Sequence, residues 1–436
     1  MLDSYDGRWG GCSLERSTMR RPVLIVGSAP RITIPVARSL HAHGVPVEVA
    51  SFSAVEPPPW SRAVSDFIRL PTLHDRTDHD RTEEDNRSPA LLESLTELIS
   101  QRRYDMLIPA NDTALVLVSQ HDARLRELLY VACPPPQVVR RVLDKSLTLE
   151  IARKAGIHVP STYRVSSTSE LEAISSQLRF PVVAKPYHKS DEMGFKVRYF
   201  QTYELLHQAL ADDDRLGSRL LLQEFAQGDG VGIEVLMHHG EPVAIFQHRR
   251  LKEVPASGGV AAVAIAEPLE PMLVDQALAL LRALEWEGVA MVEFRYDRGR
   301  HRSSLMEVNG RYWGTLALPV QAGVDFPWYE WQIAHGEEPA VPLNYSVGAR
   351  WRWSAGYLSR WHDLAKDSVR KVFQHPAGLK ELIPSFADLN TRDALWDATD
   401  PMPAIGEMLR TVKDLAVSDV KGIMRALSPV RPRTRI

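Results

Sequence analysis

The sequence has little of what marks several common protein classes. It contains only 2 cysteines in 436 residues, Cys12 and Cys133, too few for a disulfide framework or a four-cysteine zinc site. We therefore expect a cytoplasmic protein. No apolar run approaches the ~18–20 residues of a membrane-spanning helix, the longest candidate being residues 258–266. Residues 1–20 lack the apolar core of a secretory signal, so the sequence predicts no contact with a membrane and no export.

An excess of charge of one sign is also lacking. The 52 Lys and Arg residues against 55 Asp and Glu residues give a formal net charge of -3. This balance argues against a protein that binds nucleic acid through bulk electrostatic attraction, and we expect no nucleic-acid partner. A hydrophobic content of 44% is ordinary for a globular chain, and the length predicts about two to four domains.

The first region alternates strands and helices. Residues 23–26 form a short apolar run, a helical pattern follows to Leu40, and residues 45–50 predict the next strand. This order is typical of a βαβ unit and predicts an α/β region with a parallel sheet. The turn at residues 27–29 has one glycine, and Glu48 lies where a dinucleotide-binding protein places its ribose carboxylate. A single glycine favours a plain strand-to-helix turn over a dinucleotide site.

From residue 178 the pattern changes to hairpins, and the last one carries candidate metal ligands. Glu307 and Asn309 lie two positions apart, so they face the same side of a strand. Glu293 lies on the partner strand among apolar residues, where an uncompensated carboxylate costs several kcal/mol. Two carboxylates and an amide oxygen suit Mg²⁺ or Mn²⁺ rather than zinc. The alternative is a surface ion-pair cluster, and Arg311 could hold an anion beside the metal.

Two lysines are candidates for binding phosphate. Lys185 ends an apolar strand beside a polar loop, and Lys145 lies on a helix that follows three consecutive prolines. A lysine at the end of a strand can hold a phosphate as a point charge. Taken alone, each lysine is also compatible with an ordinary surface charge.

The order of these motifs resembles the ATP-grasp superfamily, especially its carboxylate–amine ligase and carbamoyl-phosphate-synthase-like branch. Residues 307–314 read Glu-Val-Asn-Gly-Arg-Tyr-Trp-Gly, which is similar to the Glu-x-Asn-x-Arg-aromatic-Trp-Gly motif of that family. The resemblance extends over residues 22–335. The other motifs that carry it are, in order, Asp144-Lys145, Lys185-Pro186, Met193-Gly194, Gln223-Glu224-Phe225, Gly232-x-Glu234, residues 248–255 with Gly258-Gly259, and Glu293.

This resemblance implies a fold class that combines α/β and α+β parts, the ATP-grasp architecture. After a tail at residues 1–21, an N-terminal Rossmann-like lobe would occupy residues 22–140. Two α+β lobes would clamp ATP, a small lobe at residues 141–225 and a large metal-binding lobe at residues 226–340. Residues 341–436 are predicted to be mostly helical, and they could cap the acceptor site or mediate homodimer formation.

The resemblance also implies roles for individual residues. Lys145 and Lys185 would hold the ATP phosphates under a loop that contains Lys189 and Gly194. The backbone of Glu224, Phe225 and Ala226 would meet the adenine, and Glu234 or, alternatively, Asp229 would meet the ribose. Mg²⁺ or Mn²⁺ would bind to Glu293, Glu307 and Asn309. Arg250 and Arg311 would grip the acyl phosphate or the carboxylate.

The implied activity is an ATP-dependent ligase that joins a small carboxylate to an amine through an acyl phosphate. Two alternatives remain open at this point. One is a kinase or carboxylase-like enzyme of a small acid, and the other is a nucleotide-binding regulatory protein without turnover. The loop at residues 187–195 departs from the family pattern because Gly194 is its one glycine. No Gly-x-Ser-x-Gly turn or cysteine flanked by histidine offers a covalent nucleophile.

Overall fold

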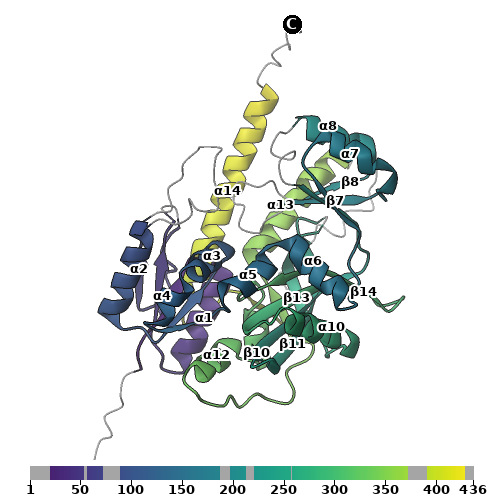
Figure 1. Ribbon diagram of the computed structural model, residues 1–436. Helices are drawn as coiled ribbons and strands as arrows, with labels where there is room; N and C mark the ends of the chain where they lie inside the picture. Colours follow the sequence, from purple (N-terminus) through teal and green to yellow (C-terminus); the bar gives the residue numbers. More distant parts are fainter. Residues whose placement is uncertain are drawn as a thin grey trace, which may run out of the picture.

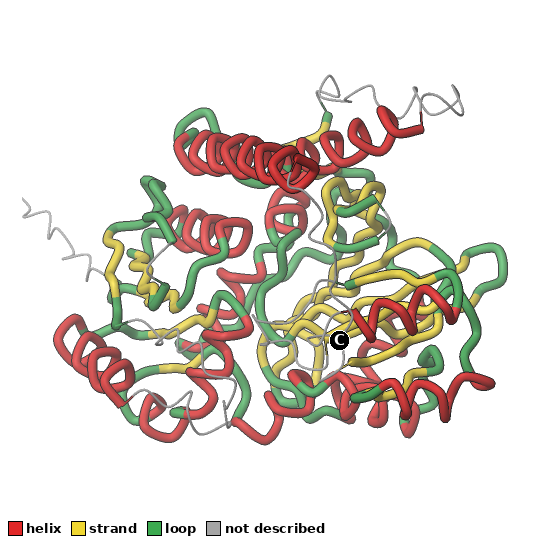
Figure 2. Tube along the Cα trace, turned by 90° about the horizontal axis from the view of Figure 1, so that it is seen from above, coloured by secondary structure: helices red, strands yellow, loops and turns green. Residues whose placement is uncertain are grey.

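The computed structural model describes residues 20–53, 56–71, 89–186, 197–212, 220–256, 258–371 and 390–427. Within these residues the strands form three sheets of five, four and seven strands. Figure 2 shows the strands of the N-terminal lobe on one side of the molecule and the larger group of strands on the other. No helix of the described part is long and apolar enough to cross a membrane.

The N-terminal lobe is a parallel sheet with the order β3-β2-β1-β4-β5. The continuous apolar run of β1 is buried on both faces, as expected for a parallel strand covered by helices. The strands are β1 (Val23–Val26), β2 (Val47–Ser51), β3 (Asp66–Arg69), β4 (Met106–Pro109) and β5 (Tyr130–Val131). The helices are α1 (Pro30–Ala42), α2 (Pro89–Arg102), α3 (Asp112–Gln120), α4 (Asp122–Arg126) and α5 (Pro136–Leu143).

The carboxyl ends of the strands in this lobe hold helix caps. The Asn111 side chain caps α3 by accepting a hydrogen bond from the backbone N–H of Ala114. The Glu48 carboxylate accepts hydrogen bonds from Tyr104 and Arg102. Because Tyr104 and Arg102 already bind the Glu48 carboxylate, this carboxylate is not available to a ribose. The structure therefore agrees with the plain strand-to-helix turn that the sequence predicts at residues 27–29.

The small lobe has its own antiparallel sheet, with the order β6-β9-β7-β8. Its elements are β6 (Thr162–Val165), α7 (Thr168–Ile174), a short 3-10 helix (Ser175–Gln177), β7 (Val182–Pro186), β8 (Arg198–Phe200), α8 (Tyr203–Asp212) and β9 (Leu220–Glu224). The preceding helix α6 (Lys145–Lys154) packs instead against the large lobe, where Leu149 and Ala152 share a core with Leu280. A separate hydrophobic core lies beneath this sheet, including Val182, Phe200 and Leu222. In Figure 1 the small lobe stands apart from the N-terminal lobe.

The largest sheet has the order β14-β13-β10-β11-β12-β15-β16 and is antiparallel except for its last pair. Its strands are β10 (Asp229–His238), β11 (Glu241–Val254), β12 (Val260–Ala266), β13 (Gly288–Asp297), β14 (Arg302–Asn309), β15 (Arg350–Arg352) and β16 (Thr391–Asp393). The helices beside it are α10 (Pro271–Ala283), α11 (Ala317–Ala322) and α12 (Phe326–Ala334). The last two strands come from the region predicted as mostly helical, so that region also extends the large sheet.

Two long helices make up the rest of the C-terminal region. They are α13 (Ser354–Lys371) and α14 (Met402–Leu427), and they run side by side past the lobes in Figure 1. His362 of α13 contacts Asp419 of α14, with 3.0 Å between Nε2 and Oδ2. Arg360 of α13 also donates a hydrogen bond of 2.7 Å to the backbone carbonyl of Glu253 on β11. The helices are therefore connected both to each other and to the large sheet.

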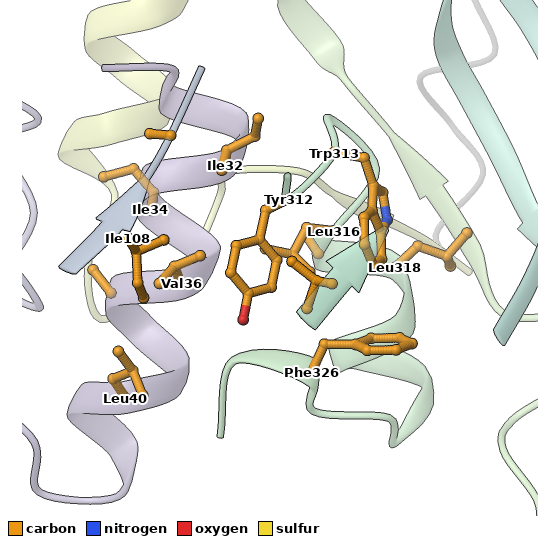
Figure 3. Close-up of a cluster of buried hydrophobic side chains, with 14 of the residues drawn as sticks. Ile32, Ile34, Val36, Leu40, Ile108, Tyr312, Trp313, Leu316, Leu318 and Phe326 are labelled. Carbon is orange, nitrogen blue, oxygen red and sulfur yellow. The ribbon is translucent and has the colours of Figure 1, made fainter. Parts of the chain in front are cut away.

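One hydrophobic core joins the N-terminal lobe to the large lobe. Apolar residues of α1, such as Ile34 and Leu40, belong to the same buried cluster as Tyr312, Trp313 and Phe326. Figure 3 shows the side chains of α1 facing the segment that follows β14. These two lobes therefore form one packed unit, whereas the small lobe has a core of its own.

Candidate active site

The site begins with two carboxylates that lie opposite each other on paired strands. Glu293 of β13 is in register with Glu307 of β14, and Met291 with Asn309. The Asn309 amide nitrogen donates a hydrogen bond of 3.0 Å to Glu293 Oε1, and only 13% of the Glu293 side chain is exposed. Like charges directly opposite each other destabilise a sheet. The structure therefore needs cations at this position.

Two lysines supply part of this positive charge. Lys185, on β7, donates a hydrogen bond of 2.6 Å to Gln223 on β9. Burial lowers the pKa of Lys185 to about 8; Glu307 opposes this shift, and nearby Lys145 adds to it. Lys145 is the first residue of α6, whose amino end is capped by the Asp144 carboxylate. The sequence-predicted lysines and carboxylates thus lie close enough to change each other's ionisation.

Arg250, on β11, contacts Glu293 from across β10, which lies between β11 and β13. Its Nη2 lies 2.5 Å from Glu293 Oε2, and its Nη1 donates a hydrogen bond of 2.9 Å to the Gly259 carbonyl. Glu253 lies 3.7 Å from Arg250 and 2.9 Å from Arg295. Sequence reasoning missed Glu253 and Arg295, since a single charge on a strand gives no local signal of such a network.

Arg311 joins the large lobe to the N-terminal lobe. Its Nε and Nη2 donate to the two oxygens of Asp112 at 3.0 and 3.1 Å, while Nη1 donates to the Tyr312 carbonyl. Asp112 is the first residue of α3, at the carboxyl edge of the parallel sheet. The planar fork of Arg311 is therefore already used by a carboxylate of the protein. Arg311 contributes charge and position to the site rather than an open fork.

The segment predicted to meet adenine lies at the edge of the small lobe. Glu224 ends β9, and its N–H donates to the Ser161 carbonyl. The N–H of Phe225 donates to the Pro181 carbonyl, and 40% of Phe225 is exposed. An exposed aromatic residue at the junction between two lobes leaves an apolar surface beside Ala226 for a flat ring.

Of the two carboxylates considered for ribose, the structure does not bring Glu234 to the site surface. Glu234 is completely buried, and its Oε1 lies 2.5 Å from Nδ1 of His248 on the neighbouring strand. Burial raises the pKa of Glu234, which its partner His248 opposes. Asp229 is half exposed and lies near Arg249 and Arg298. Asp229 pairs with Tyr296, three positions along β10 from the pair formed by Gly232 and Glu293, so it faces the other side of the sheet from Glu293. The contact with ribose stays a prediction. Lys189 and Gly194 lie outside the described residues.

Three further residues join the site from distant parts of the chain. The Arg31 guanidinium, on α1, lies 3.8 Å above the centre of a Trp353 ring. The Trp353 indole N–H donates a hydrogen bond of 2.9 Å to Glu407 of α14. Burial lowers the pKa of Arg31 to about 10, with Glu407 opposing and Arg311 and Arg250 adding to the shift. No motif of the sequence points to this group, because its three members lie on distant segments of the chain.

The donor set fits a hard divalent cation. Glu293 and Glu307 present carboxylate oxygens from adjacent strands, and Asn309 lies beside them with an amide oxygen. Oxygen donors of this kind suit Mg²⁺, and the repulsion between the two carboxylates would fall if a cation lay between them. The residues that the sequence proposed as metal ligands are therefore compatible with such an ion.

Comparison with known proteins agrees with this architecture. Residues 217–356 match the model of a family described as an ATP-grasp in the biosynthetic pathway with the Ter operon. These residues include the large sheet up to β15 and the whole carboxylate pair. This part of the chain is therefore similar to ATP-grasp proteins.

A similar curated protein is a D-alanine–D-alanine ligase of Carboxydothermus hydrogenoformans. It is 26% identical over 184 residues, which make up 38% of this chain and 58% of that ligase. The match therefore spans less than two thirds of the relative. It supports the superfamily assignment, whereas the activity of the whole relative is a matter for experiment.

Two solved structures have the same fold. The L-amino acid ligase from Bacillus licheniformis has a TM-score of 0.56 at 18% identity, with 73% of this chain and 75% of that chain covered. The ADP complex of an N5-carboxyaminoimidazole ribonucleotide synthetase has a TM-score of 0.59 at 15% identity, with 74% and 79% covered. At these identities the comparison establishes the fold alone.

Proposed function

We propose that this protein is an ATP-dependent ligase that activates a carboxylate as an acyl phosphate and joins it to an amine, releasing ADP and phosphate. The observation that carries the proposal is the carboxylate pair Glu293 and Glu307 with Asn309 beside it. Arg250 and Lys185 surround this pair with positive charge from two other strands. The arrangement suits the transfer of a phosphoryl group, which depends on positioning and charge neutralisation.

The nucleotide would lie between the small and large lobes. Lys145 and Lys185 would hold its phosphates, together with Lys189 and Gly194 of the loop that follows β7. The hinge at residues 224–226 would receive the adenine. Support comes from the exposed Phe225 and from the ADP complex of a protein with the same fold.

Glu293, Glu307 and Asn309 would hold Mg²⁺, with Mn²⁺ as a substitute. The ion would neutralise negative charge on the phosphates when it is bound. Around it, Arg250 balances Glu293 from β11, and Arg311 adds charge while bound to Asp112. Positively and negatively charged side chains therefore lie together at the site before any ligand binds.

The reaction requires activation because a carboxylate oxygen is a poor leaving group. A carboxylate oxygen of the substrate forms a bond to the γ-phosphorus as the bond to the β,γ-bridging oxygen breaks, and ADP leaves. The amine nitrogen then bonds to the acyl carbon, the bond to the phosphate oxygen breaks, and the nitrogen loses a proton to solvent. Arg250 and Arg311 would stabilise the negative charge in both steps. Relatives named as amino acid ligases support this reaction class.

Release of ADP tests the proposal. The full chain would be incubated with Mg-ATP and pools of small acids and amines, and ADP would be followed by a coupled assay. We expect ADP only when an acid and an amine are both present, and none from Glu307→Gln. ADP with a stable phosphorylated acid and no amide would support the kinase alternative. Tight Mg-ATP binding without ADP would support the regulatory one.

Three expectations from the sequence remain predictions. They are a homodimer, a cytoplasmic location and the absence of a nucleic-acid partner. Small-molecule substrates are consistent with the ligases to which the chain is similar.

A further inference from the structure

Arg31 is a cation of the site without a counterion in contact. Within the described part of the chain, its guanidinium makes no hydrogen bond and no ion pair, although it lies flat on the Trp353 ring at 3.8 Å. By contrast, Arg250 and Arg311 are each held by a carboxylate. Stacking on an aromatic face fixes the plane of a guanidinium and leaves its N–H edge available. Arg31 is therefore preorganised to accept a planar anion.

The position of Arg31 connects it to the reacting centre. A Cβ added at Gly314 would lie 2.7 Å from Arg31 Nη1, so the guanidinium is pressed against the segment that follows the metal-ligand strand. The pKa of Arg31 also reflects the charges of Arg311 and Arg250. Only a residue without a side chain at position 314 permits this close approach. The anion that Arg31 binds would therefore lie beside Arg250 and Arg311.

Glu407 contributes the opposite charge to the same pocket. One of its oxygens accepts the Trp353 indole N–H at 2.9 Å, and the other has no partner among the residues that the structure describes. Burial raises the pKa of Glu407, while the Trp353 hydrogen bond and Arg31 oppose the shift. Glu407 and Arg31 do not form an ion pair with each other. Both are held by one indole ring at separate positions.

The C-terminal helix is fixed where Glu407 needs it. Asp400, just before α14, accepts hydrogen bonds from Arg38 at 3.0 Å and from Ser61 at 2.6 Å. Gly406 lies against the Trp60 ring, which a Cβ there would meet at 3.0 Å. The N-terminal lobe thus holds the first turns of α14. Arg31 and Glu407 both lie outside the residues that match the family model.

We propose that Arg31, Trp353 and Glu407 bind the acid substrate of this protein as a small zwitterion, with its carboxylate at Arg31 and its ammonium group at Glu407. The proposal rests on the proposed ligase function, for which it names the class of acid. An unpaired cation and an unpaired anion in one pocket each cost desolvation energy, which a ligand of complementary charges recovers. A dicarboxylate would meet repulsion at Glu407, and a simple amine would meet repulsion at Arg31.

The carboxylate of such a substrate would be the group that is activated. Arg31 would hold one carboxylate oxygen while the other faces the phosphoryl group near Arg250. The ammonium group at Glu407 stays protonated and takes no part in the transfer. The C-terminal region would therefore determine which acids are accepted, whereas the sequence suggests that it could cap the acceptor site.

The test compares matched acids. Acid-dependent ADP release by the full chain would be measured with a panel of α- and ω-amino acids, their N-acetyl derivatives and dicarboxylates such as succinate, with a pool of amines present. We expect at least one amino acid to exceed its N-acetyl derivative by about tenfold or more in kcat/KM, the size of one charged hydrogen bond. Equal use of both forms would overturn the proposal and leave the ligase function intact.

Variants locate the effect. Glu407→Gln should bring the preference for the amino acid over its N-acetyl derivative to within about threefold, with an unchanged KM for ATP. Glu407→Lys should shift the preference towards dicarboxylates. Asp414→Asn removes the same charge from an exposed position two turns further along α14 and should keep the wild-type preference. A preference unchanged in Glu407→Gln, or lost equally in Asp414→Asn, would contradict the assignment.

A binding measurement separates this proposal from the ligase function. Thermal unfolding of the wild type would be recorded with Mg-ATP and each acid, whether or not ADP forms. Stabilisation by an amino acid but not by its N-acetyl derivative, lost in Glu407→Gln, would support the zwitterion pocket even if the ligase function fails. Acid-dependent ADP release with no such discrimination would support the ligase alone. If neither effect is observed, both the zwitterion site and the ligase function are overturned.

Discussion

Lys185 is a charged residue in a position that disfavours its charge. Burial lowers the pKa of its ammonium group to about 8, with Glu307 opposing the shift. The ammonium group donates a hydrogen bond of 2.6 Å to the side-chain oxygen of Gln223. A polyphosphate beside Lys185 favours the charged form. Above pH 8, therefore, the free protein holds this lysine mainly neutral, and a nucleotide complex would hold it charged.

We predict that Mg-ATP binding takes up protons between pH 8 and 9, with an affinity that weakens as the pH rises through the pKa of Lys185. Calorimetry in two buffers with different ionisation enthalpies measures this uptake. Lys185→Arg, whose guanidinium stays charged, should bind without it. The same uptake in both proteins would show that another group titrates.

Glu330 is a buried carboxyl group that titrates near neutral pH. It lies in the core under Tyr312, whose hydroxyl donates a hydrogen bond of 2.6 Å to Glu330 Oε2. Burial raises the pKa of Glu330 to about 7, which this hydrogen bond opposes. Between pH 4.5 and 7 the folded protein keeps a proton that the unfolded chain loses. The contribution of this group to stability is therefore complete below pH 4.5 and lost as the pH rises to 7.

Glu330→Gln should remove this loss of stability at rising pH, because an amide side chain does not ionise. We predict that the variant is more stable than the wild type at pH 8 by on the order of 1–3 kcal/mol, with a smaller difference at pH 5. Urea unfolding at both pH values checks the prediction. Glu338→Gln, at an exposed position on the following segment, should match the wild type at both. A Glu330→Gln variant less stable at pH 8 would contradict the raised pKa.

At the scale of elements, the side chain of Asp400 anchors the start of α14 to the N-terminal lobe. It is 7% exposed, and its carboxylate accepts from Arg38, Ser61 and the Arg62 backbone. These bonds connect the start of α14 to the N-terminal lobe across more than 330 positions of sequence. Without them the helix would be held by the contact between His362 and Asp419, by the hydrogen bond from Trp353 to Glu407 and by the contact of Gly406 with Trp60.

Asp400→Ala should lower the free energy of unfolding by about 2–4 kcal/mol, because it leaves Arg38 without its carboxylate. The KM for the acid should also rise while the KM for ATP stays constant, since Glu407 is displaced. Asp414→Ala, exposed on the same helix, should change stability by less than about 0.5 kcal/mol. Unchanged stability in Asp400→Ala would show that α14 is held by other contacts.

The sequence predicted the individual residues of the metal site better than it predicted which distant segments come into contact. The spacing of Glu307 and Asn309 and the pairing of β13 with β14 are local features, and a period of two residues predicts them. Arg31, Trp353 and Glu407 come from three distant segments. Their contact depends on the packing of α1 against the segment after β14 and on the anchoring of α14. No local sequence pattern indicates such packing. For the same reason the sequence did not predict the strands β15 and β16.

At the scale of the whole molecule, the lobes differ in how they are joined. The N-terminal and large lobes share a core around Tyr312 and Trp313 (Figure 3), and the small lobe has its own. The carboxylates lie on the large lobe and Lys185 lies on β7 of the small lobe, whereas Lys145 begins α6, which packs against the large lobe. A nucleotide that contacts both sets of charges would hold the two lobes together.

Amide hydrogen exchange should show this difference. We predict that Mg-ATP slows exchange in β7 and β9 of the small lobe, because binding reduces local opening, while exchange in β1 and β4 stays nearly constant. Peptide-resolved mass spectrometry measures both. ATP with EDTA in place of Mg²⁺ is the control. Equal protection of all four strands would indicate general stabilisation rather than closure of the small lobe.

The most direct test of the central claim is a thermal shift with ATP, with and without Mg²⁺, on the wild type and Glu307→Gln. A ligand at about 100 times its Kd stabilises a protein by about 2.7 kcal/mol, a clear rise in Tm. The account predicts a Mg²⁺-dependent rise in the wild type that is much smaller in Glu307→Gln. No rise at saturating Mg-ATP, or an equal rise in both proteins, would contradict the nucleotide and metal site proposed here.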